Sequence, residues 1–132
     1  MTAPSTGLQH ILSEGDDGTD LSSELTILPT GVVTTTQIPS LPDGSIDTGD
    51  IKSQSRQTLE NLKAALESVG SSLSDVAHLT IYLTDMAERA AFNDVYREMF
   101  THPYPVRCAV GVAALARPEM KVEVTALAVQ RG

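Results

Sequence analysis

The sequence has few aromatic residues, one cysteine and few basic residues. Its 132 residues include two Phe, three Tyr and no Trp, so a core has to be built from Val, Leu, Ile and Ala. Cys108 is the single cysteine and has no partner for an intramolecular disulfide. Nine Lys and Arg against seventeen Asp and Glu give a net charge of −8. Because nucleic-acid binding depends on cations that neutralise phosphates, this charge argues against such binding and against an anionic membrane surface.

Long apolar runs and targeting segments are also missing from the sequence. No run approaches the ~18 apolar residues of a membrane span, and no basic segment precedes an apolar one as in a secretory signal. The length fits one domain over residues 1–132. Residues 1–7 are expected to be frayed, because they are rich in Thr, Ser and Pro. We expect a soluble, cytoplasmic protein of a reducing compartment.

The hydrophobic pattern predicts an α+β domain. We expect strands over 8–12, 24–28, 31–38, 76–84, 106–115 and 120–130, and helices over 50–69 and 86–100. The order β-β-β-α-β-α-β-β, with hairpins at both ends, indicates one mixed sheet with both helices on one face. Alternation in strand 76–84 gives the other face polar side chains, so solvent or another subunit would cover that face.

The first helix has the clearest local signals. Leu59, Leu62 and Leu66 have the three-and-four spacing of one helical face. Asp50 can cap the start of this helix, and Gly70 suits the left-handed conformation that follows a helix end.

The most informative segment follows residues 103–105, Pro-Tyr-Pro. The prolines favour extended backbone, and the Val- and Ala-rich run after them predicts a buried strand that contains Arg107. Because burial of an unpaired charge is costly, Arg107 needs an anion. A planar guanidinium suits bidentate binding of a ligand carboxylate, and the alternative is a structural ion pair with one of the protein's acidic residues.

Glu123 is a second candidate for chemistry. It lies among apolar residues of the last strand, where its pKa can be raised and it can act as a general acid or base. A solvated strand face or a pairing with Arg107 are the alternatives. Cys108 alternates to the face opposite Arg107, and its simplest interpretation is a small buried hydrophobe. The three histidines are scattered, so no metal site is expected. No phosphate-binding glycine loop or serine-hydrolase motif is present.

Taken together, the sequence resembles the RidA/YjgF family of reactive-intermediate deaminases, formerly described as L-PSP endoribonucleases. The resemblance covers Gly31 to Val129, about three-quarters of the chain. The segments that carry it are Thr35-Thr36-Gln37-Ile38-Pro39, Gln57-Thr58-Leu59-Glu60-Asn61-Leu62-Lys63, residues 69–76, Thr80-Ile81-Tyr82-Leu83-Thr84-Asp85-Met86, Phe92-Asn93-Asp94-Val95-Tyr96, Tyr104-Pro105-Val106-Arg107 and Val122-Glu123-Val124.

The resemblance implies a fold, an assembly and an activity. The family fold is a chorismate-mutase-like α+β protomer that forms a homotrimer with three clefts between subunits, and trimer packing would cover the open sheet face. Deaminase members hydrolyse 2-imino acids, such as 2-iminobutanoate and 2-iminopropanoate, or enamine tautomers such as 2-aminoacrylate, to 2-oxo acids and ammonia. They need no cofactor or metal. The substrate is thus a small carboxylate.

The resemblance also assigns roles to residues. Arg107 would bind the substrate carboxylate, Glu123 would orient or activate the attacking water, and backbone groups near Cys108 and Ala109 would hold the imine nitrogen. Two further residues would line the cleft: Thr35, which stands where the family often has Ser, and Asn93, which would come from the neighbouring subunit.

The N-terminal part departs from the family pattern. The family's Gly-Pro-Tyr-Ser-Gln segment, which helps to close the cleft, has no counterpart, and residues 8–29 contain no tyrosine. Two alternatives therefore stay open. One is a divergent member that acts on a larger, pathway-specific substrate such as a 2-aminomuconate-type compound. The other is a non-enzymatic trimer that binds small carboxylates. A ribonuclease is disfavoured, because the chain has no basic or aromatic stripe.

Overall fold

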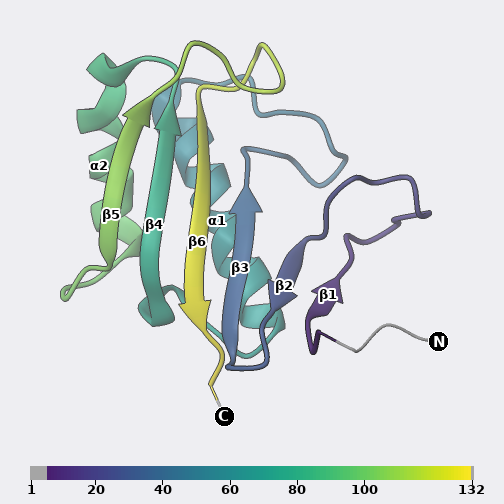
Figure 1. Ribbon diagram of the computed structural model, residues 1–132. Helices are drawn as coiled ribbons and strands as arrows, with labels where there is room; N and C mark the ends of the chain where they lie inside the picture. The colour runs from purple at the N-terminus through teal and green to yellow at the C-terminus, as the bar shows by residue number, and fades with distance from the viewer. Residues whose placement is uncertain (1–5, 132) are drawn as a thin grey trace.

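A computed structural model describes residues 6–131 and shows one six-stranded sheet with the strand order β1-β2-β3-β6-β4-β5 (Figure 1). Both helices lie on the same face of the sheet, so the predicted α+β class and element order are confirmed. Of the expected fraying at residues 1–7, residues 1–5 lie outside the described part. The elements are β1 (Gln9–Ile11), β2 (Leu25–Ile27), β3 (Val32–Gln37), α1 (Ile51–Ser68), β4 (Val76–Leu83), α2 (Arg89–Met99), β5 (Val106–Gly111) and β6 (Val122–Val129), with 3₁₀ turns at Leu73–Asp75 and Met86–Glu88.

The core lies between the sheet and the two helices. Alternate residues of β4 and β6 point towards the helices and are fully buried, and the leucines of the apolar face of α1 pack with them. Burial of each such aliphatic side chain contributes about 1.5–3 kcal/mol, so the core needs few aromatic residues. These core residues are Leu79, Ile81 and Leu83 of β4, Val122 and Val124 of β6, and Leu59, Leu62 and Leu66 of α1.

Helix α1 begins and ends where its sequence signals predict. The side chain of Asp50 accepts a hydrogen bond of 2.9 Å from the backbone N–H of Ser53, which satisfies one of the unpaired amides of the first turn. Gly70 has a φ of +79°, a conformation that costs glycine nothing because it has no Cβ. The helix is therefore held at both ends, with its leucine face against the sheet.

The predicted C-terminal hairpin is wrong. Strand β6 does not pair with β5; it lies between β3 and β4 and is antiparallel to both. Strand β5 instead pairs with β4 in parallel, and α2 makes the crossover that a parallel pair requires. The ten residues between β5 and β6, 112–121, are long enough to carry the chain past β4. In this central position, the buried side chains of β6 pack in the core between those of β3 and β4.

The prediction that the strand after Pro105 is buried is also wrong. Strand β5 is an edge strand, and Val106 and Val110 are 68% and 42% exposed. The strand ends at Gly111 and not at residue 115. A Val- and Ala-rich run predicts two covered faces, whereas no element within residues 6–131 covers the outward face of β5. The apolar residues of β5 therefore extend the open face of the sheet.

The open face carries threonines and apolar side chains in rows. Leu127 and Val129 of β6 are 41% and 50% exposed, and Thr36 and Thr125 are joined by a hydrogen bond across β3 and β6. No helix within residues 6–131 has the length and hydropathy to cross a bilayer.

Candidate functional site

Helix α2 supplies the surroundings of the Arg107 side chain. Arg107 is in register with Leu79, whose side chain is buried on the helix side of the sheet. The guanidinium carbon lies 4.6 Å from the ring centroid of Tyr96 and 5.9 Å from that of Phe92, within the range of cation–π attraction. Arg107 Nη2 also donates a hydrogen bond to Asn93 Oδ1. Phe92, Asn93 and Tyr96 thus form the α2 cradle of this cation.

The α2 cradle contains no counter-ion for Arg107. None of the ion pairs found among the described residues involves Arg107. The carboxylate nearest in sequence to the cradle, Asp94, is engaged by Lys52 at 3.2 Å and by Arg97 at 2.9 Å, and both cations lower its pKa. An internal ion pair was the alternative explanation of Arg107. Instead, neutral groups hold a half-buried positive charge, and its remaining N–H donors are suited to an anionic ligand.

The expectation that Asn93 lines the cleft of a neighbouring subunit stays a prediction. Within its own chain, Asn93 contacts Arg107. The reason is topological, because α2 leads directly into β5 and packs on the same face of the sheet to which Arg107 points. Asn93 therefore orients the guanidinium from within the protomer.

Tyr96 was not singled out by the sequence pattern, which placed it only on the apolar face of α2. Its ring stacks on Phe100 at a centroid distance of 4.5 Å and contacts Tyr104 in a tilted arrangement at 5.5 Å. The residue is 4% exposed, and its hydroxyl is buried without a hydrogen-bond partner. Burial raises the pKa of Tyr96, and the positive charge of Arg107 partly opposes this shift. The spacing of Phe92 and Tyr96, four residues apart, was the available signal for an aromatic floor.

Glu123 and Cys108 lie on the open face of the sheet. Glu123 is in register with Tyr82 of β4 and is half-buried. Desolvation raises the pKa of its carboxyl, in the direction that acid–base chemistry needs. Cys108 is in register with Thr80, and its Sγ lies 3.9 Å from Thr80 Oγ1. Cys108 is exposed, so its interpretation as a buried hydrophobe is wrong. The cause is the edge position of β5.

A single chain does not bring Arg107 and Glu123 together. Arg107 points to the helix side, whereas Glu123 points to the open face, and β4 lies between their strands. Strands are ~4.8 Å apart, so the two backbones are about 10 Å apart by this spacing. Ala109 packs at the core, but alternate backbone groups of β5 point away from β4 and have no strand partner within residues 6–131. These groups are suited to bind a ligand at the sheet edge.

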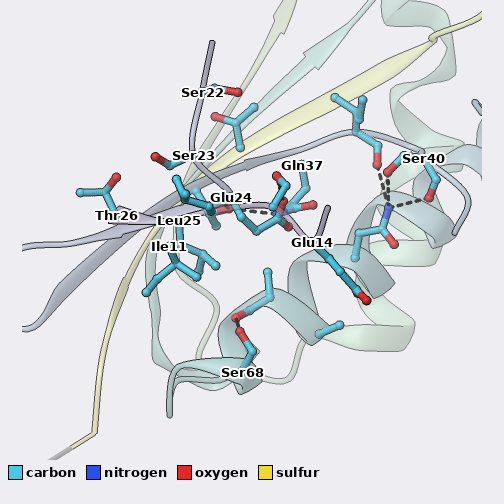
Figure 2. Close-up of a pocket in the computed structure, with 18 of the residues that line it drawn as sticks. Ile11, Glu14, Ser22, Ser23, Glu24, Leu25, Thr26, Gln37, Ser40 and Ser68 are labelled. Atoms are coloured by element: carbon cyan, nitrogen blue, oxygen red, sulfur yellow. Dashed lines mark hydrogen bonds between the residues drawn. The ribbon is translucent and has the colours of Figure 1, made fainter. Parts of the chain in front are cut away.

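Thr35 is on β3, which β6 and β4 separate from β5. It lines an open pocket of about 1280 Å³ between the N-terminal strands and α1; Figure 2 shows other residues of this lining, among them Glu24 and Gln37. The hydroxyl of Thr35 donates to the backbone oxygen of Glu24 at 2.7 Å and accepts from Gln37 Nε2 at 3.0 Å. Gln37 Nε2 also donates to Glu24 Oε1 at 3.0 Å, and Ser13 Oγ donates to Glu24 Oε2 at 3.2 Å. We call Ser13, Glu24, Thr35 and Gln37 the Glu24 network.

The described residues contain no group of three or more His, Cys, Asp or Glu side chains placed to hold a metal ion. Arg107 and its cradle can bind an anion, Glu123 can exchange a proton, and the Glu24 network can accept hydrogen bonds.

Comparison with known proteins shows the family. The model of the Endoribonuclease L-PSP family matches residues 23–130, and the chain belongs to this family, also called RidA/YjgF. A RutC family protein of Pyrococcus horikoshii is 48% identical over 93 residues, which cover 70% of this chain and 73% of that protein. The 2-iminobutanoate/2-iminopropanoate deaminase of Salmonella typhimurium is 36% identical over 103 residues, 76% of this chain and 80% of that protein.

Solved structures agree with the fold. The crystal structure of RidA from an Antarctic Psychrobacter species has a TM-score of 0.81 and 31% identity, and the match covers 92% of this chain and 98% of that one. The chain is thus similar over 92% of its length to a protein named RidA and over 76% to one named 2-iminobutanoate/2-iminopropanoate deaminase.

Proposed function

We propose that the protein is a RidA-type deaminase that hydrolyses reactive 2-imino acids and their enamine tautomers to 2-oxo acids and ammonia, in the cytoplasm. The observation that carries this proposal is the guanidinium of Arg107, which pairs with no carboxylate among residues 6–131 and is held by the neutral α2 cradle. A fixed, uncompensated guanidinium is suited to capture a carboxylate through two parallel N–H···O bonds. Relatives named as 2-iminobutanoate/2-iminopropanoate deaminases support the same chemistry.

The reaction needs only orientation and one proton carrier. With the substrate carboxylate on Arg107, water adds to C2 of the protonated imine and gives a proton to the carboxylate of Glu123. Glu123 then returns the proton to nitrogen. As the C–N bond breaks and ammonia leaves, the C2 hydroxyl gives its proton to the Glu123 carboxylate and C2 becomes the carbonyl of a 2-oxo acid; release of that proton to water or ammonia restores Glu123. An enamine is first protonated at C3 to give the same iminium. A raised carboxyl pKa brings Glu123 closer to the working pH, and proximity contributes the rest.

We further propose that the working site lies between subunits of a homotrimer. Arg107 and Thr35 are on β5 and β3, which are separated by β6 and β4, and Glu123 points to the face opposite Arg107. A site that uses all three side chains therefore requires a second copy of the chain. The partly exposed apolar side chains of the open face, among them Val106 and Leu127, would be covered by such packing.

The test follows 2-oxobutanoate release from 2-iminobutanoate that a PLP-dependent dehydratase generates in the assay. The wild-type trimer should accelerate release over buffer. Arg107→Ala should lower kcat/KM by about 10²- to 10⁴-fold, since it loses two charge-assisted hydrogen bonds of about 1.5–3 kcal/mol each. Arg107→Lys keeps the charge without the planar fork and should fall between the two.

Arg97→Ala is the matched control, because Arg97 is an arginine of α2, the helix that forms the cradle, but it pairs with Asp94 at the surface. The activity of this variant should equal that of the wild type. Light scattering checks that each variant keeps its oligomeric state. A folded trimer that gives no acceleration over buffer excludes the deaminase. If that trimer still binds 2-oxobutanoate through Arg107, the protein is a non-enzymatic carboxylate binder and not a deaminase.

A further inference from the structure

The pocket that contains Thr35 carries a second charge without a counter-ion, the carboxylate of Glu24. Its two oxygens accept one hydrogen bond each, from Gln37 Nε2 and Ser13 Oγ, and both donors are neutral. No Lys, Arg or His pairs with Glu24 among residues 6–131. A carboxylate can accept about four hydrogen bonds, so this one can still receive donors from a ligand. Figure 2 shows Glu24 beside Gln37, surrounded by the other lining side chains.

The pocket lining has one histidine, His10, and no Lys or Arg. Its charged side chains are Glu14 and Glu24, and the other polar groups are hydroxyls and amides. The molecule as a whole has a net charge of −8. A second carboxylate on a ligand would therefore be repelled here, whereas an ammonium or guanidinium group would be attracted.

The pocket is also larger than a small imino acid needs. Its volume of about 1280 Å³ exceeds the roughly 300–1,000 Å³ of pockets that hold drug-sized ligands. A two-carbon substrate side chain would leave most of this space to water. A long side chain that ends in a hydrogen-bond donor could instead reach the floor, where the Glu24 network is fixed by four hydrogen bonds.

We propose that Glu24 is a specificity-determining residue that makes this pocket a subsite for organic cations, and that the preferred substrates are 2-imino acids with a basic side chain. The inference rests on the proposed function, because it takes the Arg107 cradle of one subunit and the Thr35 pocket of another as two ends of one cleft. Arg107 then holds the carboxylate of the substrate, and Glu24 holds its ammonium or guanidinium end. Thr35 lies at the junction of the proposed cleft and the cation subsite, since the proposed function places it in the cleft and its hydroxyl belongs to the Glu24 network.

The test measures binding of stable 2-oxo acids to the wild-type protein by calorimetry. The decisive comparison is between the affinities for 2-oxo-5-guanidinopentanoate and for its neutral isostere 2-oxo-5-ureidopentanoate. These two ligands have nearly the same shape and differ in the charge of the side chain. The guanidino acid should bind at least 10-fold more tightly than the ureido acid, and 2-oxoglutarate should bind more weakly than either. Equal affinities for the guanidino and ureido acids would overturn the proposal, and no variant is needed for this result.

Glu24→Gln locates the effect. In this variant the preference for the guanidino acid should fall to less than twofold, while affinity for 2-oxobutanoate changes by less than twofold. Glu60→Gln is the matched control, since it changes the net charge equally from the exposed face of α1, outside the pocket; its preference should equal the wild type's. A preference that survives in Glu24→Gln, or is lost in Glu60→Gln, refutes the assignment to Glu24.

Failure of this inference and failure of the proposed function give different results. Agmatine, which has a guanidinium and an ammonium but no carboxylate, should bind the wild type and not Glu24→Gln even if no imine is hydrolysed. Conversely, the protein could hydrolyse 2-iminobutanoate while Glu24→Gln leaves the order of ligand affinities unchanged. That result would support the deaminase activity and refute the cation subsite.

Discussion

Gln54 ties the start of α1 to the loop before β6, and its removal should be among the most damaging single changes in the protein. The side chain is 1% exposed. Its Nε2 donates to the backbone oxygens of Asp47 at 2.8 Å and Glu119 at 2.7 Å, and its Oε1 accepts from the backbone N–H of Lys121 at 2.8 Å. One side chain thus satisfies three backbone groups that belong to two loops distant in sequence.

The expected cost of Gln54→Ala follows from these contacts. At about 1 kcal/mol net for each hydrogen bond, the loss of three costs about 3 kcal/mol, a large part of the 5–15 kcal/mol that stabilises a typical domain. Gln57→Ala is the matched control, because Gln57 is the same residue type on the same helix with one hydrogen bond, to Asn61. That variant should lose less than about 1 kcal/mol, and helix propensity changes equally in both.

Urea unfolding at a fixed protein concentration measures both variants. We expect the midpoint of Gln54→Ala to fall well below that of Gln57→Ala with an unchanged m-value, which reports the surface exposed on unfolding. If the two variants lose the same free energy, the three bonds of Gln54 do not stabilise the fold and the reasoning is refuted.

Two further predictions concern the proposed site. Tyr96→Phe keeps the aromatic ring and removes a buried hydroxyl that has no hydrogen-bond partner. The affinity of this variant for 2-oxobutanoate should stay within twofold of the wild type's, and its stability should not fall. Tyr96→Leu removes a cation–π contact of about 1–2 kcal/mol and should weaken the affinity for 2-oxobutanoate roughly 5- to 30-fold. Equal affinities of the two variants would contradict a role for the ring. Desolvation raises the pKa of Glu123, so the folded state holds the proton of this carboxyl to a higher pH than the unfolded state does. The stability of the protein relative to Glu123→Gln should therefore be highest below pH 4. It should fall as the pH rises through the pKa of Glu123 in the folded state. Urea unfolding at pH 3.5 and pH 7 checks the sign, and a constant difference between the two proteins contradicts it.

Local signals predicted most of the fold. The leucine spacing, Asp50 and Gly70 located α1 because helix boundaries depend on neighbours in sequence. The β-strands were found for the same reason, since alternation is a local property. The partner of β6 could not be found in this way. Pairing depends on contacts between residues far apart in the chain, and a strand with one buried face fits equally well beside β5 or between β3 and β4.

The site was predictable only in part. Arg107 stood out because a charge in an apolar run is unusual, and Glu123 stood out for the same reason. Tyr96 and Glu24 did not stand out, because each has an ordinary place in its own element: an aromatic on a helix face and an acid at the start of a strand. Their significance comes from neighbours distant in sequence: the guanidinium of Arg107, which lies over the ring of Tyr96, and the amide of Gln37 on β3, which donates to Glu24.

The central place of β6 has a consequence for biosynthesis. The first half of the chain can form β1 to β3 with α1, and the second can form β4, α2 and β5, but these two parts share no paired strands until β6 joins them. The middle of the sheet is therefore the piece that leaves the ribosome after the other five strands. Until then the inward edges of β3 and β4 are unprotected and open to pairing with other chains.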